Sequence, residues 1–392
     1  MTNIAGLASP GWESVRDAFA HNFTDTEEVG AGVAIYHRGE KVVDLTGGHF
    51  DGERSAPYDK STLQLVFSTT KGVVAIALGM CVERGLISYD DPVTKHWPEF
   101  AQHGKENATV AQLVSHQCGL INPDGPLTLA EVLDWETITA RLAATRPDWE
   151  IGSGHGYHAL TYGFLAGELI RRVDPQHRTP GRFVAEEIVK PLGVEMWIGL
   201  PEEQEPRVSP IIARWNDPDA DPALAEMMKV IMGPETRGGR ALFLGGVMAG
   251  DGMFNRRDVH AAEVPAANGI SNAPSLAKIY AATLGPVDGV QLLHEPVRNV
   301  ARTCVTPNGE ADLCLIVPTA FGMGFMTSTM FSAFAGPGSY GHPGAGGSVA
   351  FAQPERDLAF AYVMNRSAQN LAGDLRAQRL IDATVAVIDS GI

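Results

Sequence analysis

The sequence has few cysteines, an excess of acidic over basic residues, and no long apolar run. Its four cysteines form no CxxC pair and lack the spacing of metal ligands, so we expect free thiols rather than disulfides. The formal net charge is −16, which argues against nucleic acid or an anionic membrane as a partner, since both attract basic surfaces. No apolar run approaches the ~18 residues of a membrane span. Hydrophobic residues make up 44% of the chain and charged residues 19%, which is ordinary for a soluble globular enzyme.

Several motifs of nucleotide-binding and hydrolytic proteins are also missing. The chain contains no GxSxG, which excludes the nucleophile turn of α/β-hydrolases, and no phosphate-binding or dinucleotide-binding glycine loop. His155 and His158 form an HxxH pair without a third ligand, so we interpret them as loop residues and predict no metal and no cofactor. The start of the chain lacks a basic segment followed by an apolar one. We therefore predict no signal peptide and a cytoplasmic location.

Strand patterns lie at both ends of the chain. Near the N-terminus, two apolar runs flank the turn residues His37–Glu40, which predicts a β-hairpin. Near the C-terminus, the β-rich runs at 347–353 and 358–365 are separated by the turn PERD and predict a second hairpin. Amphipathic patterns at 11–23 and 371–391 predict a helix at each end. These patterns favour a sheet assembled from both ends of the chain.

The middle of the chain is mainly helical in pattern. Loops are predicted at 146–156 and 216–222, and the glycine-rich segment Gly233–Asn255 is not expected to form regular helix. A helical part is thus inserted between the two groups of strands. We predict two domains, which are a sheet domain of residues 1–62 and 285–392 and a mainly helical domain of residues 63–284.

Ser68 and Lys71 stand three residues apart at the start of an apolar segment. The residues from Val73 to Val82 are apolar, broken only by Gly79, and this pattern predicts a helix buried on all sides. The spacing places Ser68 and Lys71 on one face of its first turn. A serine needs a base to become a nucleophile, and burial lowers the pKa of a lysine enough to make it one. In the alternative interpretation, Ser68 only caps the helix and Lys71 extends into solvent.

This arrangement resembles the serine β-lactamase and penicillin-binding-protein superfamily. There an SxxK motif opens a central buried helix, and strands from both ends of the chain surround a helical insert. The class C β-lactamases and the family VIII carboxylesterases are the branches that share the further motifs described below. The resemblance runs from about Gly30 to Asn365. It implies an α+β fold, an α/β/α sandwich in which helices flank an antiparallel sheet.

The resemblance also implies a catalytic tyrosine, for which Tyr157 is the candidate. The segment from Trp149 to Ile170, WEIGSGHGYHALTYGFLAGELI, resembles the esterase segment that carries a YxN-type motif, with Tyr157 in the tyrosine position. A phenolate beside a lysine ammonium could take the serine proton and pass it to the leaving group. Tyr162 competes for this role, but its helical setting favours core packing. Trp149, just ahead of this loop, is a candidate to line an apolar acyl pocket.

A further motif lies in the segment YGHPGAGGSVAFAQP. His342-Pro343-Gly344 occupies the place of Lys-Thr-Gly in the superfamily. The resemblance implies that the backbone N–H groups of Ala345 and Ser68 form an oxyanion hole. We predict that His342 and Gly344 contact the substrate, because glycine at a strand edge permits a close approach. The alternative is a glycine-rich turn that merely leads into a strand.

Two departures from the superfamily pattern bear on the substrate. The lysine of Lys-Thr-Gly is His342 here, and the asparagine of YxN is Ala159, so two polar anchors for a β-lactam are missing. The resemblance is therefore closest to family VIII carboxylesterases. It implies hydrolysis of short-chain acyl or phenyl esters through an acyl-enzyme on Ser68, with Lys71 and Tyr157 handling the proton. His116, in a superfamily-like LVSHQCGL segment, is interpreted as a structural histidine.

The same residues fit other activities. A β-lactamase, a D-amino-acid amidase or peptidase, or an acyltransferase would use the same serine and lysine. A member that had lost catalysis would act as a non-catalytic scaffold, although the combination of Ser68, Lys71 and Tyr157 argues against this. We expect a small-molecule ester and water as partners. The sequence carries no signal of oligomeric state.

Overall fold

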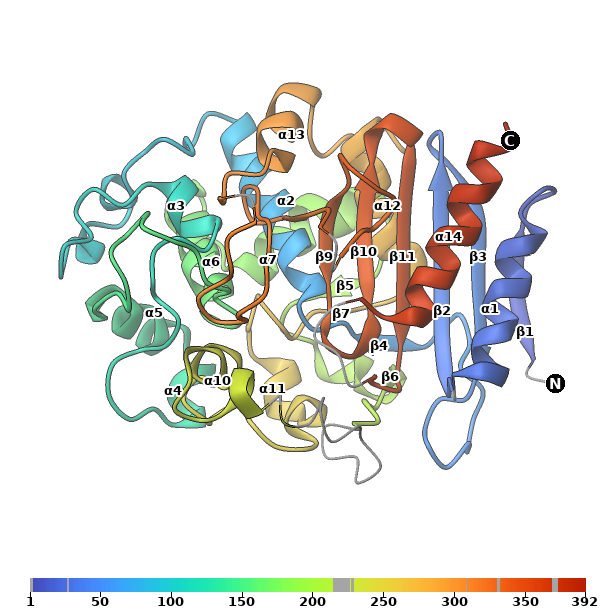
Figure 1. Cartoon of the computed structure of the whole chain (residues 1–392), viewed down its shortest axis with the longest axis horizontal. Helices are drawn as coiled ribbons and strands as arrows, with labels where there is room; N and C mark the ends of the chain where they lie inside the picture. The colour runs from blue at the N-terminus through green and yellow to red at the C-terminus, as the bar shows by residue number, and fades with distance from the viewer. Residues whose placement is uncertain are drawn as a thin grey trace.

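The structure is a computed structural model that describes residues 3–26, 28–213, 226, 229–307, 309–329, 332–368 and 373–392. Figure 1 shows a sheet and its covering helices at one side of the molecule and a mainly helical part at the other. The loop predicted at 216–222 lies outside the described residues. Within the described residues, no helix combines the length and the apolar character needed to cross a bilayer.

The main sheet is built from both ends of the chain. Its strand order is β1-β3-β2-β11-β10-β9-β8, and each neighbouring pair is antiparallel. Both predicted hairpins are present, as β2–β3 and β10–β11, and Ile35 lies opposite Phe360 where the two hairpins pair. The antiparallel sheet and the α+β fold are thus confirmed. The strands are β1 (Ile4–Ala8), β2 (Gly30–His37), β3 (Glu40–Gly48), β8 (Met326–Thr327), β9 (Tyr340–Pro343), β10 (Val349–Gln353) and β11 (Leu358–Met364).

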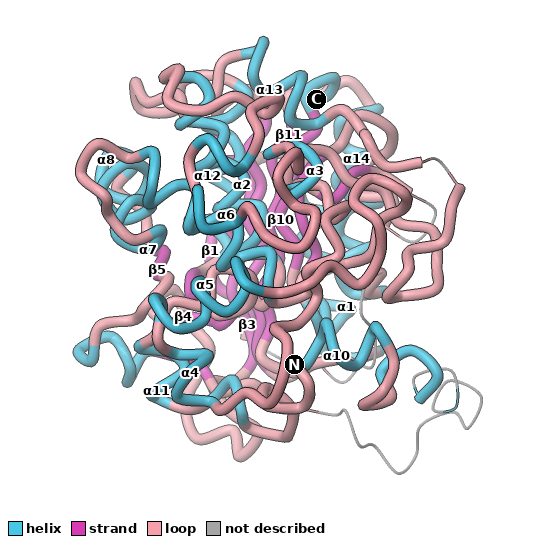
Figure 2. Tube along the Cα trace, turned by 90° about the vertical axis from the view of Figure 1, so that its left-hand side faces the viewer, coloured by secondary structure: helices cyan, strands magenta, loops and turns pink. Residues whose placement is uncertain are grey.

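Helices cover both faces of this sheet. In Figure 2, α12 (Ala273–Leu284) lies on one side of the strands, and α1 (Glu13–Asp25) and α14 (Leu375–Asp389) lie on the other. On the α1/α14 side, large apolar side chains such as Phe19, Leu380 and Phe360 share one buried cluster. The α12 side of the central strands is rich in alanine, including Ala34 and Ala361, so a helix can pack close to the backbone. These layers form the expected α/β/α sandwich.

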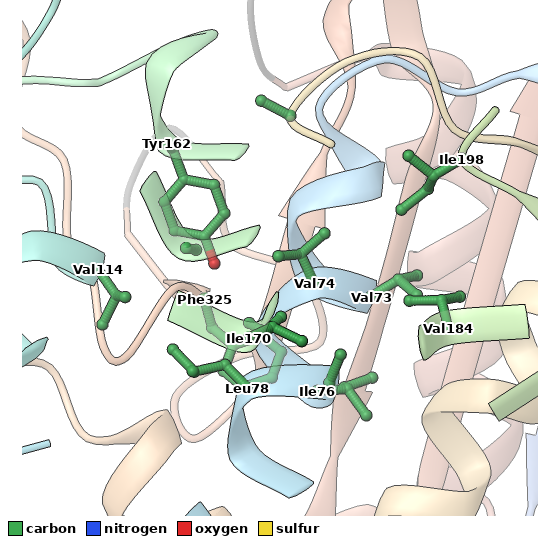
Figure 3. Packing of buried hydrophobic residues seen from close by; sticks show 14 of the residues in the cluster. Val73, Val74, Ile76, Leu78, Val114, Tyr162, Ile170, Val184, Ile198 and Phe325 are labelled. Atoms are coloured by element: carbon green, nitrogen blue, oxygen red, sulfur yellow. The ribbon is translucent and has the colours of Figure 1, made fainter. Parts of the chain in front are cut away.

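The central helix α2 (Thr69–Glu83) is buried along almost its entire length. Every residue from Thr69 to Cys81 is buried, as the apolar pattern predicts. Figure 3 shows Val73, Val74, Ile76 and Leu78 of this helix among side chains of the surrounding elements. Gly72 permits one of these contacts, because a Cβ there would lie 1.9 Å from the Tyr280 hydroxyl of α12. The helix is therefore held by packing on several sides, and its first turn is fixed with it.

A second, small sheet, of which only β4 precedes α2 in the chain, was not expected from the sequence. Its strand order is β5-β7-β4-β6, and its strands are only two or three residues long. Hydrogen bonding to β7 and β6 fixes β4 just ahead of Ser68. Its strands are β4 (Leu63–Leu65), β5 (Met196–Trp197), β6 (Val208–Ser209) and β7 (Ile270–Ser271).

The helical part contains one helix that the sequence did not predict. Within the glycine-rich segment Gly233–Asn255, residues Arg237–Phe243 form α10, so the prediction of no regular helix is wrong there. Its start is explained by Thr236, whose side chain accepts the backbone N–H of Gly239. The other helices are α3 (Val110–Val114), α4 (Leu129–Leu133), α5 (Trp135–Ala144), α6 (Thr161–Val173), α7 (Pro180–Val184), α8 (Lys190–Leu192), α11 (Arg257–Ala261) and α13 (Glu295–Arg302).

The division into two domains stays a prediction. Its boundary at residue 284 assigns α12 to the helical part, whereas α12 packs on strands β2, β10 and β11 of the main sheet. The sheet and the helical part also share one hydrophobic cluster, which includes Ala361 of the sheet and Phe164 of α6.

Candidate active site

Ser68 lies at the junction between β4 and α2. The residue before it, Phe67, has φ = +45°, a left-handed conformation that is costly for a large side chain. Ser68 stands at the N-cap position of α2, but its side chain makes no capping hydrogen bond. Its hydroxyl is instead available to two other side chains. The alternative in which Ser68 only caps the helix is therefore wrong.

Lys71 is fully buried and points its amine at Ser68. Its Nζ lies 3.0 Å from Ser68 Oγ, 2.6 Å from the carbonyl oxygen of Ala159 and 2.9 Å from that of Ala266. The alternative in which Lys71 extends into solvent is wrong, since the side chain is 0% exposed. Burial holds the pKa of the Lys71 ammonium well below its usual value. The site therefore contains a lysine that loses its proton far more readily than one in water.

Tyr157 approaches Ser68 from a loop between α5 and α6. Its hydroxyl donates to Ser68 Oγ at 2.8 Å, and Lys71 Nζ lies 4.9 Å from the centre of its ring. Burial raises the pKa of the Tyr157 hydroxyl, and the hydrogen bond to Ser68 opposes this only in part. Tyr162, the competing tyrosine, is 0% exposed within α6 and belongs to the core as expected. The structure thus brings Ser68, Lys71 and Tyr157 together.

His342 packs against the ring of Tyr157 and is almost completely buried. The two rings are stacked, with centroids 5.8 Å apart, and His342 is 1% exposed. Its Nδ1 donates to the carbonyl oxygen of Pro343 at 2.7 Å, which leaves Nε2 as the unprotonated nitrogen. Burial, and then the nearby Lys71, lower the pKa of the imidazole to about 3. His342 is therefore neutral and supplies no cation in place of the lysine of Lys-Thr-Gly.

The end of β9 brings Ala345 toward Ser68. A Cβ at Gly344 would lie 2.3 Å from the carbonyl oxygen of Val66 and 2.1 Å from the Ser348 hydroxyl, so only glycine permits this approach. The close approach is thus to the protein's own backbone, whereas contact of Gly344 with substrate stays a prediction. Among the described residues, no acceptor takes the N–H of Ala345 or of Ser68. That these two groups form an oxyanion hole stays a prediction.

An apolar cavity of about 250 Å³ opens beside Ser68. Ser68 and Ala345 line this cavity, and the rest of its wall is mostly apolar. Trp149 is not part of this wall. Its indole packs edge-on against His158, at 5.7 Å, and lies under the Arg237 guanidinium. The cavity is lined by Phe67, Ser68, Ala159, Leu160, Met232, Leu242, Phe243, Met248, Ala249, Gly250, Asp251, Phe254, Ala267 and Ala345.

The histidines near Tyr157 have structural contacts. His116 is 0% exposed, and its Nδ1 accepts the backbone N–H of His158 at 3.1 Å. His158 Nε2 accepts the N–H of Leu120 at 2.9 Å, and His155 Nε2 lies 3.0 Å from the Thr319 hydroxyl. Within the described ranges, no three His, Cys, Asp or Glu side chains are grouped so as to hold a metal ion.

Comparisons with known proteins place this site in a family. A family model described as Beta-lactamase matches residues 15–384. The chain belongs to the beta-lactamase family. It is 34% identical over 370 residues to esterase/beta-lactamase LipL of Mycobacterium tuberculosis (strain ATCC 25618 / H37Rv), a match that covers 93% of this chain and 83% of that protein.

Solved structures agree with this membership. The crystal structure of a family VIII carboxylesterase superposes with a TM-score of 0.87 at 35% identity. The superposition covers 98% of this chain and 100% of that one. A penicillin-binding protein homologue from Caulobacter crescentus gives a TM-score of 0.86 at 38% identity, with 98% and 100% coverage. The beta-lactamase-family fold thus extends over nearly the whole chain.

One residue of this beta-lactamase-family site was missed from the sequence. Asp312 is 1% exposed, and each of its carboxylate oxygens lies 3.0 Å from the backbone nitrogen of Tyr157. Phe321, nine residues further on, stacks on the Tyr157 ring with an interplanar angle of 5°. Asp312 lies in the segment ADLCLIV, where a single aspartate before apolar residues has no motif to mark it. Only the fold brings it to the tyrosine.

Proposed function

We propose that the protein hydrolyses short-chain carboxylic esters through an acyl-enzyme on Ser68. That it is a carboxylic ester hydrolase follows from its family and its esterase relatives. The mechanism rests on one observation, which is that Lys71 Nζ and Tyr157 OH lie 3.0 Å and 2.8 Å from Ser68 Oγ. A nucleophile within hydrogen-bond distance of two proton-transfer groups is the arrangement that covalent catalysis needs.

Lys71 acts as the base toward Ser68. In its neutral form the amine has two N–H bonds, and the carbonyl oxygens of Ala159 and Ala266 can accept both. The lone pair then faces Ser68 Oγ and accepts its proton. Burial supports this form, because it opposes the charge on Lys71. The Tyr157 hydroxyl, whose pKa burial raises, remains protonated and donates to Ser68 Oγ in the resting enzyme.

The acyl-enzyme forms and breaks in two balanced steps. Ser68 Oγ attacks the ester carbonyl as its proton passes to Lys71, and the N–H groups of Ser68 and Ala345 bind the oxyanion. The tetrahedral intermediate collapses, the C–O bond to the alcohol breaks, and the leaving alkoxide receives a proton through Tyr157 from Lys71. Water then attacks the acyl carbonyl and loses its proton to Lys71. The bond between the acyl carbon and Ser68 Oγ breaks, Lys71 returns the proton to Ser68 Oγ, and the acid leaves.

The cavity beside Ser68 favours small apolar esters as substrates. Its volume of about 250 Å³ exceeds the ~150 Å³ of an apolar cavity that holds benzene, so a phenyl ring or a short acyl chain fits. The residues that replace the two β-lactam anchors also argue for esters. Ala159 has no amide, and His342 is a buried neutral imidazole. An ester needs neither anchor, because its alkoxide leaves far more readily than an amine.

The test compares Lys71→Ala and Tyr157→Phe with the parent enzyme on p-nitrophenyl acetate. Each variant should lose turnover by about 10³-fold or more while remaining folded, as expected when one member of a catalytic group is removed. Tyr162→Phe is the matched control. Its hydroxyl is buried and has no hydrogen-bond partner within the described part of the chain, so turnover should be unchanged. Near-parental turnover in Lys71→Ala or Tyr157→Phe would contradict the mechanism.

Two further measurements separate the other activities. The family name and the name of the LipL relative both include beta-lactamase, so nitrocefin is assayed beside the p-nitrophenyl esters. We expect ester hydrolysis to exceed nitrocefin hydrolysis, and the reverse order would favour a β-lactamase. A fluorophosphonate probe should label Ser68 in the folded protein, and absence of labelling would favour a non-catalytic scaffold.

A further inference from the structure

The loop that carries Tyr157 has no regular secondary structure of its own. It lies between the end of α5 at Ala144 and the start of α6 at Thr161. A loop of this kind is fixed only by bonds to other parts of the chain. The segment from Asp312 to Phe321 supplies such bonds, and the mechanism above assigns it no role.

Asp312 is surrounded by hydrogen-bond donors. Besides the N–H of Tyr157, its Oδ1 accepts the N–H groups of Cys314 and Leu315 at 2.8 and 2.9 Å. Its Oδ2 accepts the Thr319 hydroxyl at 2.9 Å. Burial raises the pKa of this carboxyl, whereas the donors around it stabilise its ionised form, in which both oxygens accept. Asp312 thus links its own turn to the tyrosine loop.

A second connection runs through Thr319. Its single hydroxyl proton is donated to Asp312, so its oxygen is left to accept from His155 Nε2 at 3.0 Å. His155 is therefore protonated on Nε2. In addition, the N–H of Leu313 donates to the carbonyl oxygen of His155 at 2.9 Å. Residues 155–157 and 312–319 are thus joined by backbone, carboxylate and hydroxyl at once.

We propose that Asp312 is a positioning residue, which holds the Tyr157 hydroxyl at hydrogen-bond distance from Ser68 Oγ. This inference rests on the proposed function, since it gives Asp312 a role only through Tyr157. The Asp312 carboxylate accepts a hydrogen bond from the backbone N–H of Tyr157. Phe321 of the same segment stacks on the Tyr157 ring at a centroid distance of 6.0 Å. Together they fix both the main chain and the ring plane of the tyrosine.

The first test compares Asp312→Ala with Asp312→Asn. The alanine removes the acceptor for three N–H groups, and kcat for p-nitrophenyl acetate should fall about 10²-fold with KM within about threefold, because a displacement of ~1 Å has this effect. The asparagine keeps a carbonyl oxygen in the Oδ1 position and an N–H donor toward Thr319. It should retain kcat within about tenfold of the parent. A rise in KM at constant kcat, or an equal loss in both variants, would count against the positioning role.

The matched control is Asp174→Ala. Asp174 is also 1% exposed and accepts a backbone N–H, that of Arg178, but it lies at the far end of α6 from Tyr157. Its loss reports the general effect of deleting a buried carboxylate. Asp174→Ala should lower stability and leave kcat of the folded enzyme unchanged, and a kcat loss equal to that of Asp312→Ala would overturn the inference.

The decisive test is a double-mutant cycle with Tyr157→Phe, followed by turnover and by the rate of fluorophosphonate labelling at Ser68. If Asp312 acts only through Tyr157, adding Asp312→Ala or Asp312→Asn to Tyr157→Phe should change either rate by less than about twofold. A full additional loss would refute the inference while leaving the proposed function intact. Near-parental activity of Tyr157→Phe alone would instead refute the proposed function, and the inference with it.

Discussion

The two sides of the site are held in different ways. On the catalytic side, Lys71 and Tyr157 are 0% and 7% exposed, and hydrogen bonds fix the Lys71 amine and the Tyr157 hydroxyl at Ser68 Oγ. The other part of the cavity wall includes residues of α10 and of the turns after it. There half-buried apolar side chains such as Leu242 and Phe254 line the wall. Glycines with positive φ at 245, 246, 250 and 252 shape the turns between them.

From this difference we infer that the rate of the chemical step and the preference among esters depend on different side chains of the site. Hydrogen bonds are directional, so a small shift on the catalytic side breaks a contact that the reaction needs. Apolar packing is tolerant of changes in shape, so the cavity wall can be altered with little effect on Ser68. Substitutions on the catalytic side should therefore lower kcat for every ester. Substitutions on the cavity wall should change which ester is preferred.

Among the substitutions that test this comparison, the largest effect is expected for Gly344→Ala on the catalytic side. The new methyl group would lie 2.3 Å from the carbonyl oxygen of Val66, so the end of β9 must move away from Ser68. This displaces the Ala345 N–H, and loss of one oxyanion donor typically lowers kcat by about 10²-fold or more. Turnover of p-nitrophenyl acetate and of a longer ester should fall together.

Gly285→Ala provides the control for this substitution. Gly285 follows α12 with φ = −171°, an extended conformation open to any residue, and no atom of the described residues lies within 4 Å of its added Cβ. Its kcat and thermal midpoint should match those of the parent. If Gly344→Ala also kept the parental kcat, the close approach of β9 to Val66 would have no part in catalysis.

A smaller effect is expected for Leu242→Ala on the cavity wall. Removing the isobutyl group enlarges the apolar space beside Ser68, so longer acyl chains gain room. The ratio of kcat/KM for p-nitrophenyl hexanoate to that for the acetate should rise about tenfold, the usual range for one or two methylenes in an apolar pocket. Leu375→Ala, at an exposed leucine on α14, should leave the ratio unchanged. Equal losses with both esters would show that this wall also positions Ser68.

The same two sides differ in how well the sequence anticipated them. Ser68 and Lys71 could be found because their spacing is local and the apolar run behind them is unmistakable. Tyr157 was assigned by resemblance to an esterase segment. The main sheet followed from hairpins whose turns and alternation lie within short stretches of chain. Each of these signals is contained in a few neighbouring residues.

The features that were missed depend on contacts between distant residues. Asp312 meets Tyr157 across 155 positions of sequence, and nothing around it marks a functional aspartate. The glycines of α10 concealed a helix that Thr236 caps and the surrounding chain stabilises. Trp149 is of a residue type that often lines apolar pockets, yet its indole packs on His158. Local pattern does not determine which of several apolar neighbours a side chain will meet.

The smallest effect is expected for Lys71→Met, on the pH dependence of the free energy of unfolding. This measurement tests whether Lys71 is the base toward Ser68. Native Lys71 has a lowered pKa, so between that value and its usual pKa near 10.5 the unfolded chain binds one proton more than the native protein. The free energy of unfolding must then rise with pH across this interval.

The substitution Lys71→Met conserves the side-chain length and removes the titrating amine. The free energy of unfolding of this variant should therefore rise less steeply with pH than that of the parent. Urea unfolding from pH 6 to pH 9 measures both slopes, with exposed Lys60→Met as the control that should keep the parental slope. Parallel curves for parent and Lys71→Met would mean that native Lys71 stays charged, and the base toward Ser68 would then have to be the Tyr157 phenolate.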